Sequence, residues 1–197
     1  MGQIIISVGR EFGSGGRVIA EALAKRFDIP IYDRHLILEI AEKTGLAPEE
    51  IEKYNENPKH RLFSRSVRGY SNSIEDNIAE MQFKFIEDKA ASGESFVVVG
   101  RCSETKLRKY EGLVSLFILG DADEKVKRVM EVYDLSEEKA KDLIDKKDRK
   151  RKRYHNYHCS GHWGDSRLYD LSINSSRLGI DRTVDMLEKY IRARMSE

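Results

Sequence analysis

The stretch "GREFGSGGR", residues 9–17, follows the apolar run "IIIS", residues 4–7, and precedes a segment with helical spacing. Backbone N–H groups of a glycine-rich turn between a strand and a helix point at anions, and the helix adds the positive end of its dipole. Gly13, Gly15 and Gly16 suit such a turn because glycine adopts positive φ values and lets a ligand approach closely. The order strand, glycine loop, helix therefore predicts a phosphate-binding loop, with a plain strand-to-helix turn as the alternative.

The loop departs from the common pattern G-x-x-x-x-G-K-[ST], in which a lysine brings charge to the phosphates and a hydroxyl contacts magnesium. Gly16 and Arg17 stand in the corresponding places, and Val18 follows them. Arg17 or Arg10 is the predicted replacement for the lysine, although arginine presents a planar fork rather than a point charge. Ser14 is another hydroxyl donor within the loop. Mg²⁺ needs few protein ligands here, because phosphates and waters hold most of it.

Short apolar runs alternate with segments of helical spacing along the whole chain. The five runs that predict strands are residues 4–8, 29–33, 96–100, 114–119 and 168–174. Several are continuously apolar, as in a parallel sheet that is covered on both faces. The segments between them carry apolar residues three and four positions apart, around Leu23, Ile37, Ile78, Val129 and Leu187. This order predicts an α/β fold of the P-loop type: three layers, with helices on both faces of a five-stranded parallel sheet.

The composition indicates an ordered protein, and the predicted single domain spans residues 1–197. Of its 197 residues, 40% are hydrophobic and 35% charged, and the net charge is +1. This balance argues against a general nucleic-acid-coating protein. Cys102 and Cys159 lack C-x-x-C spacing, so reduced thiols in a cytoplasmic protein are expected. No apolar run reaches transmembrane length and the start has no signal-peptide pattern, which excludes a membrane partner.

Charged residues follow two of the predicted strands at their carboxyl ends, the edge at which open α/β sheets bind ligands. Asp33 and Arg34 follow the second strand, and Arg101 follows the third. All three are predicted to bind an acceptor substrate. The alternatives are a helix N-cap for Asp33 and a structural arginine at position 101. The polar stretch after the second strand predicts an acceptor-binding excursion, at about residues 47–92.

A basic segment predicts a lid at about residues 136–163. It begins as a helix capped by Ser136, and six basic residues then fall within residues 146–152, followed by interleaved Tyr and His. In a lid, Arg151 and Arg153 would neutralise charge during phosphoryl transfer, and Asp148 would orient these bases or the acceptor. A solvated helix face and a nucleic-acid or anion patch are the alternatives.

A helix would also place several of these residues on one face. Lys147, Lys150, Arg151 and Tyr154 fall at spacings of three and four positions. The pattern H-x-x-H-C-x-x-H that follows has enough donors for zinc, but it matches no common structural zinc pattern. No metal ligands are predicted from it.

These residues together resemble the cytidylate kinase-like family, a branch of the nucleoside monophosphate kinases with phosphate-loop folds. The resemblance rests on "ISVGREFGSGGRVIAEALAKRFDIPIYDRHLI", "VVVGR", "DKKDRKRKRYHNY" and "WGDSRLYDLSINSSRLGIDRTVDMLEKYI". It implies phosphoryl transfer from ATP, with Mg²⁺, to a nucleoside monophosphate such as CMP. Asp33 and Arg101 match residues beside the monophosphate, and Asp148 and Arg151 match places in the lid.

The chain departs from cytidylate kinases in two places. These enzymes keep G-x-x-G-x-G-K-G-T where this chain has "EFGSGGRVI", and Asn174 stands where an aspartate is usual. A nucleotide- or anion-binding regulator without transfer activity is therefore the alternative function. A nucleic-acid-binding domain built on "DRKRKRYHNY" is a third hypothesis, which the balanced net charge disfavours. The sequence leaves the oligomeric state open, a homodimer included.

Overall fold

The computed structural model describes residues 2–33, 45, 66–67, 70–71 and 74–195. Arg34, the predicted helix around Ile37 and about half of the predicted excursion lie outside this part of the chain. Within it, β3 (Ser66–Val67) and β4 (Tyr70–Ser71) form a short antiparallel pair. No helix in the described part of the chain has the length and the apolar character needed to cross a membrane.

Five parallel strands form the central sheet, in the order β2-β5-β1-β6-β7. The strands are β1 (Ile5–Arg10), β2 (Ile31–Tyr32), β5 (Phe96–Val99), β6 (Leu113–Leu119) and β7 (Leu171–Asn174). The predicted five-stranded parallel sheet is confirmed. In the register, Ser7 of β1 lies opposite Val98 of β5 and Ser115 of β6. The glycine loop after β1 therefore opens at the middle of the sheet edge, beside the turn that follows β5.

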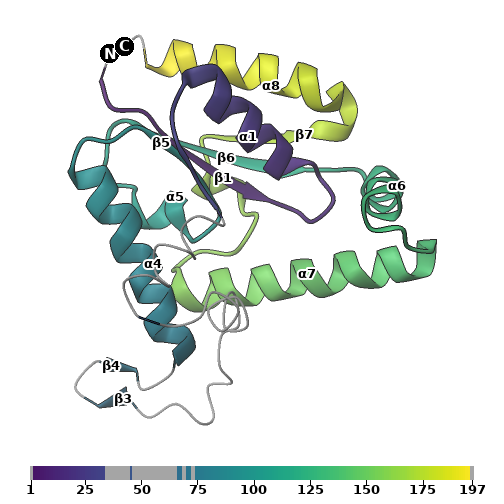
Figure 1. Cartoon of the computed structure of the whole chain (residues 1–197), viewed down its shortest axis with the longest axis horizontal. Coiled ribbons are helices and arrows are strands. Elements are labelled where there is room, and N and C mark those ends of the chain that lie inside the picture. Colours follow the sequence, from purple (N-terminus) through teal and green to yellow (C-terminus); the bar gives the residue numbers. More distant parts are fainter. Residues whose placement is uncertain (1, 34–44, 46–65, 68–69, 72–73, 196–197) are drawn as a thin grey trace.

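Helices cover both faces of this sheet (Figure 1). On one face lie α1 (Gly16–Phe27) and α8 (Ser175–Arg194), and on the other lie α4 (Ile74–Ala91) and the short α5 (Ser103–Lys106). The strands are apolar on both sides for this reason: Ile6 packs with α1 and α8, whereas Ile5 packs with α4. A strand that is covered by helices on both faces of the sheet must therefore be apolar along its length.

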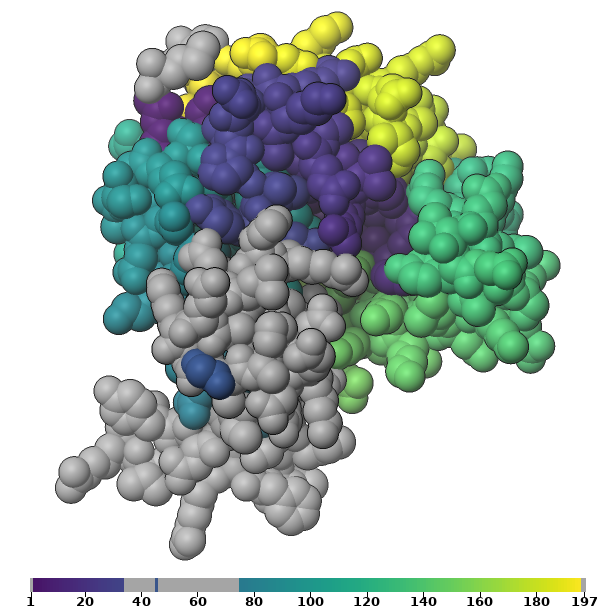
Figure 2. Space-filling view, in the orientation of Figure 1, coloured from purple at the N-terminus to yellow at the C-terminus, as the bar shows by residue number. Residues whose placement is uncertain are grey.

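Two further helices, α6 (Ala122–Tyr133) and α7 (Glu137–His158), extend beyond the carboxyl edge of the sheet. They pack together through Val129, Ala140 and Ile144. The segment that predicts a lid is one continuous helix of 22 residues, and it is followed by the turn η1 (Ser166–Leu168). Ser136 occupies the N-cap position as predicted, but its side chain makes no capping hydrogen bond. In Figure 2 the green surface of α6 and α7 meets the purple N-terminal segment.

Candidate functional site

The glycine loop has the backbone that the sequence predicts. Gly13 and Gly15 adopt positive φ values, of 82° and 77°. A Cβ atom on Gly15 would lie 2.3 Å from the side chain of Ile180, and one on Gly16 would lie 2.5 Å from Cβ of Arg10. Only glycine fits both places, because the loop is enclosed between α8 and the end of β1. Since α1 begins at Gly16, the positive end of its dipole faces the loop.

Ser14 is used inside the loop. Its buried hydroxyl donates to the carbonyl of Glu11 at 2.9 Å and accepts from the N–H of Gly16 at 3.3 Å. The carbonyl of Ser14 accepts from the hydroxyl of Ser175 at 2.6 Å, which joins the loop to α8. Ser14 therefore fixes the shape of the loop, and its hydroxyl is not among the groups that line the cavity beside it.

A cavity of about 430 Å³ lies beside the loop. Cationic side chains dominate its lining: Arg10, Arg17, Arg101, Arg128, Lys147, Lys150 and Arg151. Two carboxylates, Glu11 and Asp33, and an apolar side that includes Phe12, Val132 and Tyr133 complete it. Seven cations against two carboxylates suit a polyanionic ligand, and the volume is in the range of small-molecule sites.

Arg17 and Asp33 lie together at one side of the cavity. Nε of Arg17 is 2.9 Å from Oε1 of Glu21 and 3.4 Å from Oδ2 of Asp33. The Arg17 side chain is 51% exposed, whereas that of Asp33 is 18% exposed. The structure thus brings these two predicted residues together, while the pair with Glu21 holds the guanidinium along α1.

Three successive residues with positive φ follow β5: Gly100 (75°), Arg101 (62°) and Cys102 (53°). Such values are uncommon outside glycine and cost free energy, so the surrounding structure must hold this turn. The turn buries Arg101, which is 5% exposed, yet leaves it lining the cavity. Arg10 reaches the same turn, since a Cβ on Gly100 would lie 2.3 Å from its Nη1. The ends of β1 and β5 therefore carry adjacent arginines.

The basic helix α7 presents two different faces. Lys147, Lys150 and Arg151 line the cavity at the glycine loop, and Tyr154 is buried one turn further on, as the spacing predicts. Arg151 also donates from Nη1 to the carbonyl of Arg10 at 3.2 Å. Arg153 lies elsewhere: it lines a separate cavity with Lys146, Arg149 and Lys152. The structure does not bring Arg153 to the residues with which the sequence grouped it.

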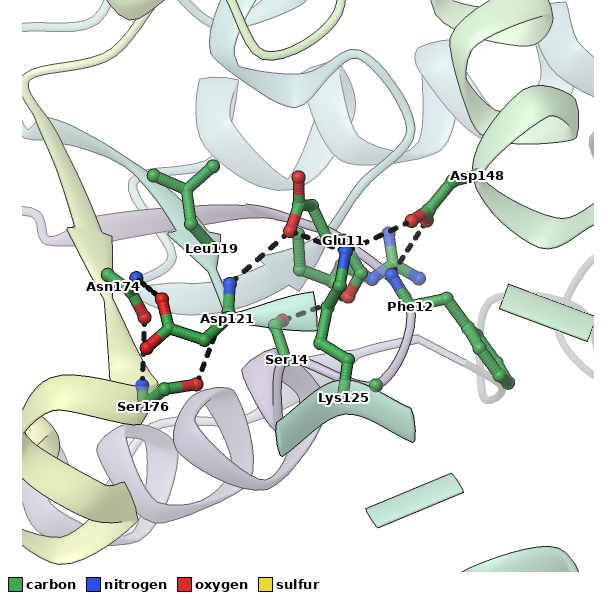
Figure 3. Close-up of polar contacts among 12 residues, drawn as sticks. Glu11, Phe12, Ser14, Leu119, Asp121, Lys125, Asp148, Asn174 and Ser176 are labelled. Carbon is green, nitrogen blue, oxygen red and sulfur yellow. Dashed lines mark hydrogen bonds and ion pairs between the residues drawn. The ribbon is translucent and has the colours of Figure 1, made fainter. Parts of the chain in front are cut away.

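Asp148 joins α7 to the glycine loop (Figure 3). Its Oδ1 accepts from the backbone N–H of Phe12 at 2.7 Å and lies 3.7 Å from Nη1 of Arg151. Its Oδ2 lies 3.9 Å from Nζ of Lys125. Burial raises the pKa of Asp148, which the Phe12 hydrogen bond and the two cations oppose. Asp148 thus lies beside Arg151, and its side chain is not among those that line the cavity.

Sequence reasoning missed the contribution of α6. Nζ of Lys125 lies 2.9 Å from Oε2 of Glu11, and this carboxylate also accepts from the N–H of Gly120 at 3.3 Å. Arg128 donates from Nη1 to the carbonyl of Gly13. The spacing of three positions between Lys125 and Arg128 places both on one face of a helix, and this was the available signal. No local feature of the sequence indicated that this face of α6 lies beside the glycine loop.

The last strand ends in a polar network that the sequence indicated only by residue type. Asn174 caps α8, because its Oδ1 accepts from the N–H of Ser176 at 3.0 Å. Its Nδ2 donates to Oδ1 of Asp121 at 2.7 Å, and the hydroxyl of Ser176 accepts from the N–H of Asp121 (Figure 3). Asp170 accepts from both the N–H and the hydroxyl of Ser115. Asn174 therefore joins the end of β7 to the start of α6, whereas Asp170, just before β7, bonds Ser115 within β6.

Among the described residues, the cavity offers two carboxylates to Mg²⁺, so a bound ligand would have to supply further oxygens. Asp33 and Glu11 are the carboxylates that line the cavity, and Glu11 is already paired with Lys125. Mg²⁺ prefers oxygen ligands and keeps several waters, so one or two carboxylates beside bound phosphates fit its needs. The residues present are thus compatible with a magnesium–polyphosphate complex.

The histidine–cysteine pattern is divided in the structure. His158 packs against the rings of Phe83 and Tyr154, with centroid distances of 5.3 Å and 4.6 Å. Burial lowers the pKa of His158 to about 4. His155 and Cys159 instead approach Glu104 of α5. The residues of this sequence pattern are therefore separated, and Glu104 from another element joins two of them.

Comparisons with known proteins agree with this architecture. The sequence profile of the cytidylate kinase-like family matches residues 5–177. A solved structure of an uncharacterized protein from Eubacterium ventriosum is 40% identical, with a TM-score of 0.77, and the match covers 96% of this chain and 99% of that one. No curated protein sequence matches the chain.

More distant structures share the fold. Shikimate kinase from Bacteroides thetaiotaomicron matches with a TM-score of 0.57 at 14% identity, over 96% of this chain and 98% of that one. Shikimate kinase from Aquifex aeolicus matches with a TM-score of 0.51 at 13% identity, over 98% of both chains. The predicted P-loop kinase fold is confirmed. Because the family profile spans most of the sequence, the chain belongs to the cytidylate kinase-like family.

Proposed function

We propose that this protein is an ATP-dependent kinase that transfers the γ-phosphoryl group of Mg-ATP to a nucleoside monophosphate such as CMP. The observation that carries the proposal is the cavity at the glycine loop, where seven cationic side chains surround about 430 Å³. A triphosphate and an acceptor phosphate bring enough negative charge to balance such a lining. Membership in a kinase-like family and the P-loop kinase fold support the same chemistry.

The proposed roles follow from position. Residues 13–16 hold the ATP phosphates with Arg10 beside them, and Arg17 takes the place of the usual lysine. Arg151 reaches the same space from α7. Asp33 and Arg101, at the ends of β2 and β5, hold the acceptor. Arg153 has no role here because it lines the other cavity.

The mechanism needs charge neutralisation more than proton transfer. An acceptor phosphate is ionised near neutral pH, so no strong general base is required. The arginines position the two phosphates in line and stabilise the charge that develops on the transferred group. Mg²⁺, when bound to ATP beside Asp33 or Glu11, would neutralise phosphate charge. Burial of Arg101 and the many contacts of Arg151 favour positions fixed before the ligand binds.

A regulator that binds nucleotides without transferring phosphate is the second candidate. Two observations favour it: the Ser14 hydroxyl is used within the loop, and Arg17 is half exposed and paired with Glu21. Arg17 also reaches toward a bound phosphate differently from the lysine that usually stands in this loop. A cytoplasmic location and a homodimer stay predictions.

The test is a screen of the purified chain with Mg-ATP against CMP, dCMP, UMP, AMP, GMP and shikimate, with ADP release as the readout. Calorimetry measures ATP binding in parallel. Arg17→Ala is compared with Arg26→Ala, a matched control at the far end of α1, where Arg26 pairs with Asp185 and Glu188. Loss of Arg17 is expected to lower turnover roughly 100- to 1,000-fold, as removal of a group that stabilises transition-state charge does.

Each outcome separates the two functions. Turnover with a nucleoside monophosphate that survives Arg26→Ala and fails with Arg17→Ala supports the kinase. ATP binding without turnover on any acceptor would sink the kinase and favour the regulator. Turnover with shikimate alone would show that shikimate, not a nucleoside monophosphate, is the acceptor. Unchanged turnover in Arg17→Ala would show that Arg17 does not replace the usual lysine.

A further inference from the structure

A second group of reactive side chains lies where the end of α7 meets α5, and the proposed kinase reaction does not use it. One carboxylate oxygen of Glu104, one ring nitrogen of His155 and the sulfur of Cys159 lie within 4.8 Å of one another. Cys159 packs against the buried cluster that contains Cys102, and neither cysteine is in a disulfide. Three donor side chains from two parts of the sequence thus converge, and Cys102 packs beside them.

This group is buried in a way that needs explanation. Glu104 and His155 are each 4% exposed, and Cys102 is 3% exposed. Nε2 of His155 and Oε1 of Glu104 are 2.8 Å apart, so this pair satisfies one ring nitrogen. Nδ1 of His155 is also buried, and no hydrogen-bond partner is found for it among the described residues. Burying polar groups without full pairing costs free energy, so an additional ligand would stabilise the cluster.

The donor set identifies the class of ligand. Two cysteine sulfurs, an imidazole and a carboxylate are the ligand types of tetrahedral zinc sites. Bonds of about 2.0–2.3 Å to one centre place tetrahedral donors roughly 3.3–3.8 Å apart. The donor atoms of Glu104, His155 and Cys159 lie within 4.8 Å of one another, so a modest contraction would bring these three to one ion. Cys159, at the C-cap of α7, is half buried, so it is the most accessible donor of the cluster.

We propose that Glu104, His155 and Cys159, with Cys102 beside them, bind a thiophilic divalent cation of the Zn²⁺ type. The cation joins the last turn of α7 to the strained turn after β5. These are the two elements that carry Arg151 and Arg101 to the phosphate cavity, so the ion fixes their relative positions. This inference does not depend on the proposed kinase activity.

The test uses Co²⁺ as a spectroscopic probe for Zn²⁺ on the reduced, tag-free full chain. One Co²⁺ per chain is expected to give thiolate-to-metal absorption, and added Zn²⁺ is expected to abolish it. Cys159→Ser and Cys102→Ser each remove one sulfur, and each is expected to weaken Co²⁺ binding at least roughly 10-fold. The matched control is His162→Asn, an exposed histidine of the same sequence pattern that lies outside the cluster. Circular dichroism establishes that each variant is folded.

Thermal unfolding gives a second readout, because an ion that binds only the folded chain raises its stability. Zn²⁺ is expected to raise the Tm of the wild-type chain and of His162→Asn, but not that of Cys159→Ser. Thiolate absorption that is lost in Cys159→Ser and kept in His162→Asn supports the proposal. A Co²⁺ spectrum without thiolate absorption, or equal binding by the wild type and Cys159→Ser, overturns it. Because no ATP is present, either outcome leaves the test of the kinase untouched.

Discussion

Replacing Asp148 tests whether the glycine loop depends on α7. In the wild type the carboxylate accepts the N–H of Phe12 at 2.7 Å. Asp148→Ala leaves this partly buried N–H without its acceptor, which is expected to lower the free energy of unfolding by about 1–3 kcal/mol. Asp148→Asn keeps an oxygen for the N–H and removes only the charge. Because burial raises the pKa of Asp148, the charged form is disfavoured there, and a smaller loss is expected for the amide.

Urea titrations of the wild type, both variants and Asp142→Ala measure this difference. Asp142 is an exposed residue of the same helix, so its loss is expected to change the free energy of unfolding by no more than about 0.5 kcal/mol. Amide hydrogen exchange gives a local readout. Exchange at Phe12 is expected to accelerate roughly 10- to 100-fold in Asp148→Ala alone. If Asp148→Ala is as stable as Asp142→Ala and protects Phe12 equally, the hydrogen bond does not hold the loop.

Three other changes probe the site and the fold. Lys147→Ala is expected to weaken ATP binding about tenfold, equivalent to ~1.4 kcal/mol. Lys146 lines the other cavity, so Lys146→Ala is expected to leave ATP binding nearly unchanged. Equal losses of ATP affinity in calorimetry would contradict this placement. Gly100→Ala and Gly93→Ala both force a side chain to positive φ, and in urea titrations each is expected to cost about 1–2 kcal/mol. Only Gly100→Ala, whose Cβ would lie 2.3 Å from a guanidinium nitrogen of the cavity, should also impair ATP binding. Burial raises the pKa of Glu94, but its two hydrogen bonds outweigh burial and leave that pKa below the ordinary 4.5. Its charged form therefore adds stability above about pH 4.5 that is lost as the pH falls through the lowered pKa, so urea titrations of Glu94→Gln should show a weaker loss of stability in acid than the wild type.

The sequence determined the fold because its signals are local. Continuous apolar runs mark strands buried on both faces, and apolar spacing of three and four marks the helices between them. The loop could be predicted for the same reason, since its glycines stand directly between a strand and a helix, although the contact of Gly15 with Ile180 could not. The positions of Asp33 and Arg101 followed from the rule that the carboxyl ends of parallel strands share one edge.

Tertiary packing decided which polar side chains meet. Helical spacing separates Arg151 from Arg153, but only the packing of α7 on α6 shows that the face with Arg151 lies toward the glycine loop. The same packing turned Asp148 to the backbone of Phe12.

Contacts between distant segments have no local signal in the sequence. Glu11 meets Lys125 across 114 positions, and Glu104 meets His155 across 51. Periodicity reports which side of an element is buried, whereas the partner of a buried charge depends on how whole elements pack. The sequence by itself therefore determined the layers and the loop, and only the tertiary structure decided which charges surround the cavity and which donors form the second cluster.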